Sequence, residues 1–423
     1  MSKRENSNVP QIRFKGFDGE WQLKSLSDLI ALENGFAFKS RNFSARPTST
    51  VVLTPGNVKV GGGFQHGKGQ YYLENQNIPN KFIFEAGDIF VTMTDLTPTS
   101  QALGFPAIVP KDSNIYLHNQ RLGKLVGYHG HEGFLFYSLC VPKVQKEVVS
   151  TASGTTVKHT SPSKFLNRDF CLPTKDEQAK VGVFFQELDQ LIQQHLHKHD
   201  KLVTLKQAML QKMFPQPGAT APEIRFKEFE GEWEEKKLGE LMPITSAARV
   251  HKHEWTRSGV PFFRTSDVVS LYKGEENAKA FISLDLYEKL SDKIGRIKCG
   301  DILITGGGSI GIPFLAKSDD PLYFKDADLL WLKVPGSVDS IYLYVFFSSV
   351  RFRGYLGSIS HIGTIGHFTV EQAKKTPIAI PLQAEQKKIG TYFRQLDELI
   401  ARHATQLEKL KQVKVACLEK MFI

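Results

Sequence analysis

A few short segments carry residue types whose spacing could support catalysis. Gly306–Gly311 (GGGSIG) fits a loose glycine pattern for phosphate binding, and Gly67-Lys68-Gly69 resembles part of a P-loop. The P-loop needs Ser or Thr after its Lys, which is absent here, and a lone glycine pattern is a weak signal that more often marks a turn. Neither segment predicts a nucleotide site.

The acidic residues and histidines likewise form no complete catalytic or metal-binding motif. Glu385-Gln386-Lys387 has the E-x-K spacing of metal-dependent nucleases, but no acid pair suitably precedes it, so we interpret it as the start of a helix. The histidines of 195–199 alternate, and residues i and i+2 point to different helix faces, which disfavours a metal site. The chain also lacks the Asp/Asn/Ser-Pro-Pro-aromatic tetrapeptide of adenine methylation. We therefore predict no catalytic residue, no metal site and no cofactor bound by this chain, which we do not expect to be an enzyme by itself.

Composition places the chain among globular proteins. Its 423 residues suffice for two or three domains, and 41% hydrophobic with 23% charged residues excludes a mainly disordered chain. The longest apolar run, 341–347, is too short for a membrane helix, and no apolar segment follows the basic start. The four cysteines form no C-x-x-C pair. We expect a soluble, reduced, cytoplasmic protein.

The net charge of +10 admits a polyanionic partner without requiring one. Residues 10–172 carry 17 basic and 12 acidic side chains, whereas residues 222–380 carry 21 of each. The excess is therefore neither a basic tail nor a single block, and charge alone leaves an ordinary basic surface as an open alternative.

Internal repetition dominates the sequence. Residues 10–21 (PQIRFKGFDGEW) and 222–233 (PEIRFKEFEGEW) are identical at 9 of 12 positions, and 173–214 matches 381–422 at 19 of 42 without a gap. Between these ends the similarity falls away. The chain is thus two copies of one unit, each a divergent body followed by a similar segment. We predict a body at 1–172, a long helix at 173–214, a linker at 215–221, a body at 222–380 and a second long helix at 381–423.

The similar segment is predicted to be a long helix. Acidic residues follow Pro173 and Pro381, as in a first helical turn, and hydrophobic residues then recur at heptad spacing. One row contains Leu188, His195, Leu202 and Met209 in the first copy and Leu396, His403, Leu410 and Cys417 in the second. A second row is predicted at Leu191, Lys198, Leu205 and Lys212, and Ile192 and Met213 widen the stripe. A stripe this long with polar interruptions favours helix pairing. His195 and His403 are interpreted as polar residues that set register.

The bodies are predicted to be mixed α/β. Short strands are expected at 82–84, 88–93, 122–126, 301–305 and 329–334, with helices at 134–139 and 341–350. The fold class is α+β: two mixed α/β domains separated by two long antiparallel helices that form a coiled coil, with pseudo-two-fold repetition. Trp21 and Trp233 recur in both copies, so we predict that they pack in the core rather than read different sequences.

The two motifs carry a family resemblance. R-F-x-x-F-x-G-E-W at the start, with P-x-x-x-E-Q-x-K and F-x-x-L-D-x-L-I in the closing helix, both occurring twice, resembles the specificity subunit of a type I restriction–modification enzyme. The resemblance implies that each body is a target-recognition domain for one half of a split, asymmetric double-stranded DNA site. It also implies two methyltransferase subunits that use S-adenosylmethionine for adenine N6 methylation, and two restriction/motor subunits that use ATP and Mg.

DNA contacts are expected where the bodies differ. Arg or Lys recognises guanine, Asn or Gln recognises adenine, and Lys, Arg, Ser or Thr binds phosphate. The candidate DNA-binding residues are Asn119, Gln120, Arg121, Lys158, His159, Thr160, Arg249, His251, Lys252, Arg264, Ser266 and His361. Two alternatives stay open: a fused or type II-like methyltransferase specificity protein, disfavoured by the missing tetrapeptide, and a non-catalytic coiled-coil scaffold without nucleic acid.

Overall fold

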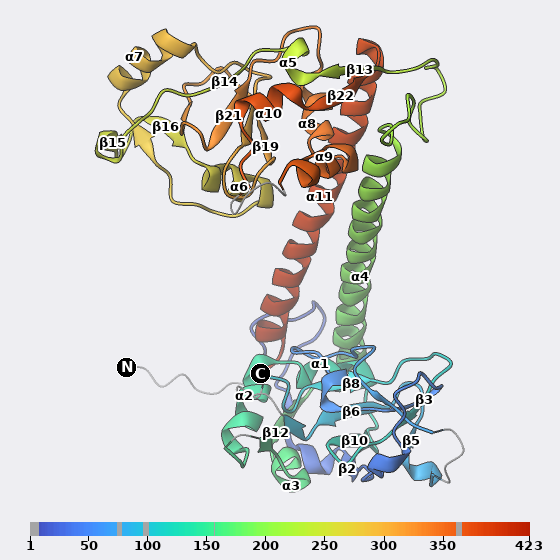
Figure 1. The fold of residues 1–423 in the computed structure, drawn as a ribbon. Helices are drawn as coiled ribbons and strands as arrows, with labels where there is room; N and C mark the ends of the chain where they lie inside the picture. The colour runs from blue at the N-terminus through green and yellow to red at the C-terminus, as the bar shows by residue number, and fades with distance from the viewer. Residues whose placement is uncertain (1–7, 74–77, 96–100, 156, 361–365) are drawn as a thin grey trace. The chain divides into compact units, whose positions relative to one another are not determined.

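The computed structural model describes residues 8–73, 78–95, 101–155, 157–360 and 366–423. Contacts divide the chain into two compact units: unit 1 comprises residues 1–196 and 405–423, and unit 2 comprises residues 197–404. Each unit is mixed α/β and contains segments of both long helices, α4 (Lys175–Lys212) and α11 (Gln383–Met421) (Figure 1). The domain boundaries inferred from the repeat remain a prediction, since the units divide within both helices.

Unit 1 contains two four-stranded sheets. One has the order β2-β10-β6-β8 and is entirely antiparallel; the other has the order β4-β3-β9-β5 with a parallel β3–β9 pair. Two-stranded sheets join β1 to β12 and β7 to β11. The strands are β1 (Gln22–Ser25), β2 (Ala31–Asn34), β3 (Thr50–Val52), β4 (Gln70–Tyr71), β5 (Ile83–Phe84), β6 (Ile89–Thr92), β7 (Thr94–Asp95), β8 (Pro106–Ile108), β9 (Ile115–Leu117), β10 (Leu122–Val126), β11 (Lys158–His159) and β12 (Asp169–Leu172). The helices of the body are α1 (Glu132–Leu139), α2 (Pro142–Thr151) and α3 (Pro162–Leu166).

Unit 2 repeats this plan with different insertions. Its antiparallel sheet has the order β14-β21-β18-β19, its second sheet has the order β15-β17-β16-β20 with a parallel β16–β20 pair, and β13 pairs with β22. The strands are β13 (Glu234–Lys237), β14 (Ile244–Ser246), β15 (Trp255–Thr256), β16 (Val260–Phe263), β17 (Phe281–Ile282), β18 (Ile302–Thr305), β19 (Pro313–Leu315), β20 (Tyr323–Phe324), β21 (Leu329–Leu332) and β22 (Pro377–Ile380). The helices are α5 (Leu238–Leu241), α6 (Thr265–Lys273), α7 (Leu284–Ile294), α8 (Ser340–Phe346), α9 (Val350–Ser360) and α10 (Val370–Lys375).

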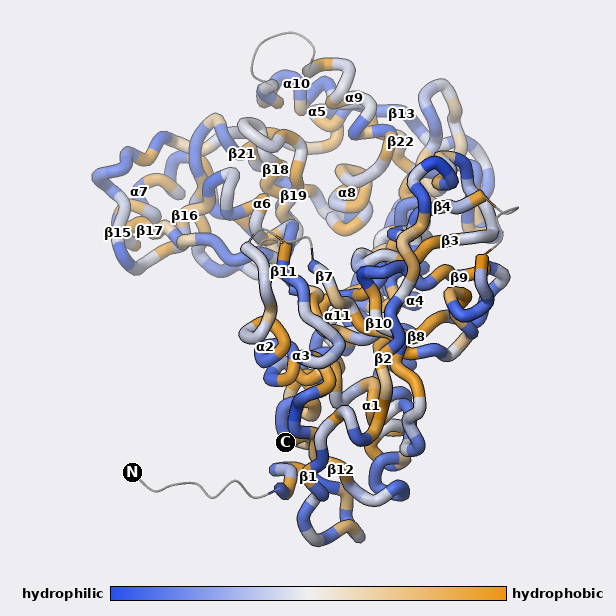
Figure 2. Tube along the Cα trace, turned by 90° about the horizontal axis from the view of Figure 1, so that it is seen from below, coloured by the Kyte–Doolittle hydropathy of each residue, from blue (hydrophilic) through white to orange (hydrophobic). Residues whose placement is uncertain are grey.

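The strands expected from the sequence form, and most of their hydrophobic residues are buried. All four residues of β6, β18 and β21 are buried, and Figure 2 shows hydrophobic residues along the central strands, for example β10 and β18. The single helix expected at 341–350 is wrong. The chain forms α8 and α9 instead, with an interruption at 347–349 where Phe347 and Ser349 are buried.

Aromatic rings fill the core of each unit around the end of one long helix. In unit 1, Phe422 lies 5.4 Å from Phe134, 5.7 Å from Phe185 and 6.5 Å from Trp21, measured between ring centroids. In unit 2, the equivalent Phe214 lies 6.4 Å from Trp233. Trp21 and Trp233 are 3% and 4% exposed. The packing role predicted for the two tryptophans is confirmed.

A buried ion pair joins the first motif to the start of a long helix in each unit. The Arg13 guanidinium donates through Nε and Nη2 to the two carboxylate oxygens of Glu177, each at 2.7 Å. Arg225 and Glu385 form the same bidentate pair at 2.8 and 2.7 Å. Glu385 is fully buried, and this hydrogen bond raises the pKa of Arg225. The E-x-K segment is therefore helix-start chemistry, as predicted.

Segments of α4 and α11 pack antiparallel within each unit. In unit 1, Lys414 donates to Asp189 at 2.6 Å; in unit 2, the equivalent Lys206 donates to Asp397 at 2.5 Å. Of the predicted pairing residues, Leu188 and Leu396 are buried, Met209 packs on the unit 2 core, Leu410 and Cys417 pack on the unit 1 core, and His195, Leu202 and His403 are half-buried.

The second heptad row lies one residue further along than expected. Leu191 and Leu205 are 45% and 40% exposed, whereas Ile192 and Leu407 are buried. Hydrophobic contacts along paired helices alternate between spacings of three and four residues. Phe185 to Leu188 takes the spacing of three, so the next contact falls four residues later, at Ile192.

Candidate nucleic-acid interface

One end of the antiparallel sheet in unit 1 collects the side chains that the sequence selected. β2 ends there, β10 begins there and β6 ends there. The backbone of Asn119 forms a bridge with Phe36, and a Cβ on Gly35 would lie 2.2 Å from the Asn119 carbonyl oxygen. Only glycine fits this close approach. The sheet therefore fixes the position of the 119–121 turn.

The second predicted segment of unit 1 lies beside the first. Met93 N donates to Arg121 O at 2.9 Å, and Thr160 N donates to Met93 O at 3.0 Å. Residues 119–121 and 158–160, 39 positions apart in the chain, therefore reach one sheet end through Met93.

Side chains at this end differ in what they offer a ligand. Gln120, Arg121 and His159 are exposed, and Lys158 is half-buried. The side-chain Oδ1 of Asn119 accepts a hydrogen bond from Arg121 N at 2.9 Å, which shapes the turn. Thr160 is 5% exposed, so its hydroxyl is buried rather than presented to a ligand. The donors and acceptors best placed at the surface are those of Gln120, Arg121 and His159.

A buried histidine, His118, packs next to the 119–121 turn and stabilises it. His118 is 1% exposed, and its Nε2 lies 3.0 Å from the Leu122 carbonyl oxygen, so Nε2–H donates. Burial, with a further contribution from Lys124, lowers the pKa of His118 despite opposing effects of Leu122, Glu33 and Asp88.

Unit 1 should therefore lose stability in mild acid. A histidine whose folded pKa is depressed is protonated first in the unfolded state, so stability is present above the unfolded pKa of about 6.5 and falls below it, by up to about 1.4 kcal/mol per pH unit. Hydrogen exchange of unit 1 between pH 7.5 and 5.5 measures this slope, and His118→Gln should flatten it. Equal slopes in both proteins would contradict the assignment.

The equivalent sheet end of unit 2 holds a different set of residues. β14 leads into Arg249, β21 is preceded by residues 325–328, and β18 is followed by Gly306–Gly308. The Gly306 N donates to Asp328 O at 2.8 Å, and Thr265 Oγ1 donates to the same oxygen at 3.3 Å. The glycine segment is a turn at this end, as interpreted from the sequence.

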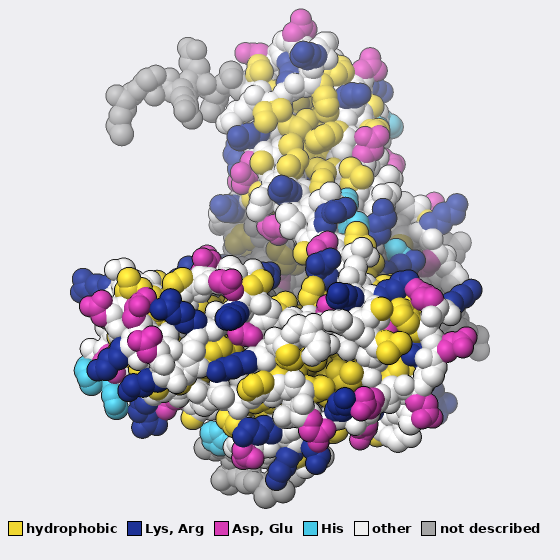
Figure 3. Space-filling model, turned by 90° about the horizontal axis from the view of Figure 1, so that it is seen from above, with side chains coloured by type: hydrophobic (Ala, Val, Ile, Leu, Met, Phe, Trp, Pro, Cys, Tyr) yellow, Lys and Arg dark blue, Asp and Glu magenta, His cyan; other side chains and the backbone are white. Residues whose placement is uncertain are grey.

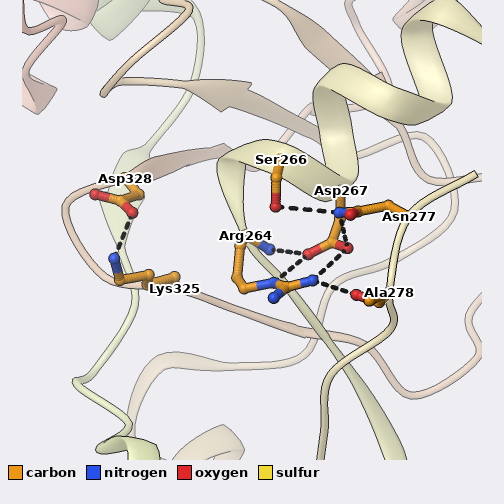
Figure 4. Close-up of polar contacts among 7 residues, drawn as sticks. All are labelled: Arg264, Ser266, Asp267, Asn277, Ala278, Lys325 and Asp328. Atoms are coloured by element: carbon orange, nitrogen blue, oxygen red, sulfur yellow. Dashed lines mark hydrogen bonds and ion pairs between the residues drawn. The ribbon is translucent and has the colours of Figure 1, made fainter. Parts of the chain in front are cut away.

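The guanidinium of Arg264 is engaged in hydrogen bonds within unit 2 (Figure 4). Its Nε donates to Asp267 Oδ2 at 2.7 Å, its Nη2 donates to Asp267 Oδ1 at 3.0 Å and also to the Ala278 carbonyl. The hydrogen bond to Asp267 raises the pKa of Arg264. Ser266 is exposed and accepts from Asn277 at 3.1 Å. Arg264 therefore fixes the start of α6 and has little of its fork left for a ligand.

The remaining predicted DNA-binding residues of unit 2 lie away from the 325–328 turn or outside the described residues. His251 and Lys252 are exposed on the segment that leads to β15, where His251 stacks on His253 at 5.6 Å between centroids. His361 lies outside the described residues. Within the described ranges, no group of three or more His, Cys, Asp or Glu side chains suits a metal ion, and no helix is long and apolar enough to cross a membrane.

Sequence reasoning missed several groups at these ends. His367 occupies the place of His159: Phe368 N donates to Gly306 O as Thr160 N donates to Met93 O. The signal was present, because Gly-Thr precedes a histidine at similar spacing in both copies (154–159 and 363–367). Asp326 and Asp328 were also missed. They pair with Arg249 and Lys325, so cations in unit 2 are neutralised locally.

Charges of both signs are mixed on one face of the molecule. Figure 3 shows Lys and Arg interspersed with Asp and Glu over the face in view, with no single-sign patch dominating it. A surface with interspersed charges of both signs attracts polyanions weakly at long range.

The chain matches the model of a known protein family. The model for the type I restriction modification DNA specificity domain matches residues 18–207 and 230–412, that is, both copies of the repeat. The chain belongs to this family. It is a type I restriction–modification specificity subunit.

Relatives of this specificity subunit are divergent. The MjaVIII specificity subunit of Methanocaldococcus jannaschii is 24% identical over 296 residues, 66% of this chain and 67% of that protein. A Haemophilus influenzae protein, provisionally named a type I restriction enzyme specificity subunit, is 27% identical over 165 residues. That match spans 38% of this chain and 40% of the relative.

Solved structures share the fold of the specificity subunit. The S subunit of a type I restriction-modification system from M. genitalium has a TM-score of 0.61 and 14% identity, with 98% of this chain and 99% of that chain covered. A structure reported for complex assembly and conformational transition of a type I R-M system has a TM-score of 0.51 and 18% identity, with 95% and 97% covered.

Proposed function

We propose that this specificity subunit binds a bipartite, asymmetric DNA site, with one half-site contacted by each unit at the end of its antiparallel sheet. One observation carries the proposal: the same backbone frame presents different side chains in the two units. Asn119-Gln120-Arg121 precedes β10, whereas Asp326-Ala327-Asp328 precedes β21 at the equivalent register. A shared frame with exchanged donors and acceptors is what reading two different half-sites requires.

The chemistry is proposed to reside in partner subunits. Two methyltransferase subunits would use S-adenosylmethionine to methylate adenine N6 at the site, and two restriction/motor subunits would use ATP and Mg to restrict unmodified DNA. This chain would act without catalysis of its own, in the cytoplasm, by placing the partners on DNA. The similar motifs of its two copies support equal docking of two identical partners.

Methylome sequencing tests this function. Cells with the gene should carry one interrupted, non-palindromic N6-methyladenine motif that disappears when the gene is deleted. The purified chain alone should neither transfer methyl groups nor hydrolyse ATP, and it should gain methylation activity on adding the methyltransferase subunit. An unchanged methylome after deletion, or turnover by the pure chain, would overturn the proposal.

A further inference from the structure

Arg249 is held by a carboxylate that leaves its outer nitrogens available. Its side chain is 70% exposed, and its Nε lies 3.0 Å from Asp326 Oδ2. Among the contacts of the described residues, Nε is the one guanidinium nitrogen of Arg249 with a hydrogen-bond partner. The carboxylate of Asp326 is only 17% exposed. The hydrogen bond from Nε to Asp326 thus holds the guanidinium in place and leaves the fork formed by Nη1 and Nη2 free to bind a ligand.

The turn that carries Asp326 is itself fixed and strained. Lys325 N donates to Phe263 O at 2.8 Å, Asp328 N donates to Asp326 O at 2.7 Å, and Ala327 N donates to Ser246 Oγ at 3.0 Å. Ala327 has φ of 60°, the one non-glycine residue with positive φ among those described. A residue with a Cβ is strained in the left-handed region, and such strain is concentrated at positions where a side chain must be held in place for function. Here the turn places Asp326 beneath Arg249.

The charge balance of this pair suits base recognition better than phosphate binding. Arg249 and Asp326 together carry no net charge, so they add little to the counterion-driven attraction of the DNA backbone. Two parallel N–H donors nevertheless match the O6 and N7 acceptors of guanine in the major groove, the pairing that arginine makes most often. Anchoring at Nε also reduces the rotamer entropy lost on binding.

Unit 1 lacks this arrangement at the same place. Asn34 in β2 pairs with Gly123, and Ser246 in β14 pairs with Leu330, so three residues beyond these strands Ala37 corresponds to Arg249. Asn119 occupies the position of Asp326. The anchored arginine therefore belongs to unit 2 alone, as a determinant of one half-site should.

We propose that Arg249 recognises one guanine in the half-site of unit 2 through Nη1 and Nη2, and that Asp326 is a positioning residue for its guanidinium. This inference rests on the proposed function. It adds the identity of one recognised base and of the residue that recognises it.

The test uses the full chain with its methyltransferase subunit and duplexes that carry the site from methylome sequencing. Every base pair of the unit 2 half-site is varied in turn, and 7-deazaguanine, which lacks the N7 acceptor, replaces each guanine singly. Arg249→Ala should reduce discrimination at one G·C pair about 10- to 100-fold and leave preferences in the other half-site unchanged. At that position 7-deazaguanine should weaken binding by the unaltered complex and have no further effect on Arg249→Ala.

Further variants separate positioning from folding. Asp326→Asn should weaken discrimination at the same base pair and change nothing more in the Arg249→Ala background. Arg249→Lys, which keeps the charge but loses the fork and its anchor on Asp326, should discriminate at this base pair less than the unaltered complex and become insensitive to Asp326→Asn. The matched control is Arg296→Ala, because Arg296 forms an exposed pair with Glu288 in unit 2, 3.3 Å apart and away from the sheet end; its preferences should stay unchanged.

The outcomes distinguish this inference from the function beneath it. A half-site without a guanine, or an equal loss for all sequences on Arg249→Ala, overturns the inference while the specificity function stands. If the unaltered complex shows no sequence preference at all, the proposed function fails first.

Discussion

Glu385→Ala is expected to destabilise unit 2 by about 3 kcal/mol while leaving unit 1 nearly unchanged. The substitution leaves the Arg225 guanidinium, whose side chain is only 16% exposed, without its carboxylate partner. Removing one member of a buried ion pair costs about 3–5 kcal/mol, and partial exposure of Arg225 puts the cost at the lower end. Native-state hydrogen exchange should show amide protection in residues 222–380 reduced by about two orders of magnitude.

The repeat supplies a matched control for this experiment. Glu177→Ala breaks the equivalent pair with Arg13 and should transfer the loss of protection to unit 1. Replacing both members, Arg225→Met with Glu385→Leu, should cost less than Glu385→Ala, since no charge stays buried alone. Equal loss of protection in both units from either substitution would show that they unfold as one block.

A chain of residues 1–214 is expected to form a two-fold dimer that recognises a palindrome. Unit 1 needs the segment 405–423, which the short chain lacks, but residues 197–214 of a second copy match 405–422 at 8 of 18 positions. The identical positions include the key contacts: Lys206 replaces Lys414 opposite Asp189, and Phe214 replaces Phe422 among the core rings. Two identical bodies then contact identical half-sites.

Light scattering and methylation mapping with the partner subunit measure this result. Phe214→Ala in the short chain should yield monomers, because it removes an aromatic ring worth about 3–5 kcal/mol from each of two cores. Leu202→Asp should weaken the dimer by placing a half-buried carboxylate between the paired helices. Leu205→Ala, at an exposed position, should leave the dimer intact. A monomer that still methylates the original asymmetric site would refute the model.

The sequence predicted the architecture well because the repeat compares the chain with itself. Duplicated motifs predicted the buried tryptophans and the helix starts, and short hydrophobic runs predicted the strands of the mixed α/β bodies. It could not place the second heptad row, since spacings of three and four both follow Leu188. Nor could it separate α8 from α9, because the break at 347–349 (Phe-Ser-Ser) carries neither Gly nor Pro.

The candidate interface was predictable only in part. Clusters of polar residues led to Asn119–Arg121 and Arg249, which lie at equivalent sheet ends. Whether an arginine is available depends on carboxylates distant in sequence or across a helix turn. Asp267 engages two nitrogens of Arg264, and Asp326, 77 residues from Arg249, engages one. Composition gives no such information.

The order in which the chain is synthesised makes the two units unequal. Unit 2 is continuous, so all of it is present once residue 404 has been made. Unit 1 waits for residues 405–423 while the ribosome adds residues 197–404, roughly 10–40 s at about 5–20 residues per second. Throughout that interval Trp21, Phe134 and Phe185 lack the Phe422 ring. Phe214, the equivalent residue of the first copy, is synthesised before Phe422. The duplication that produced two similar units thus also supplies a competing segment for the nascent core of unit 1.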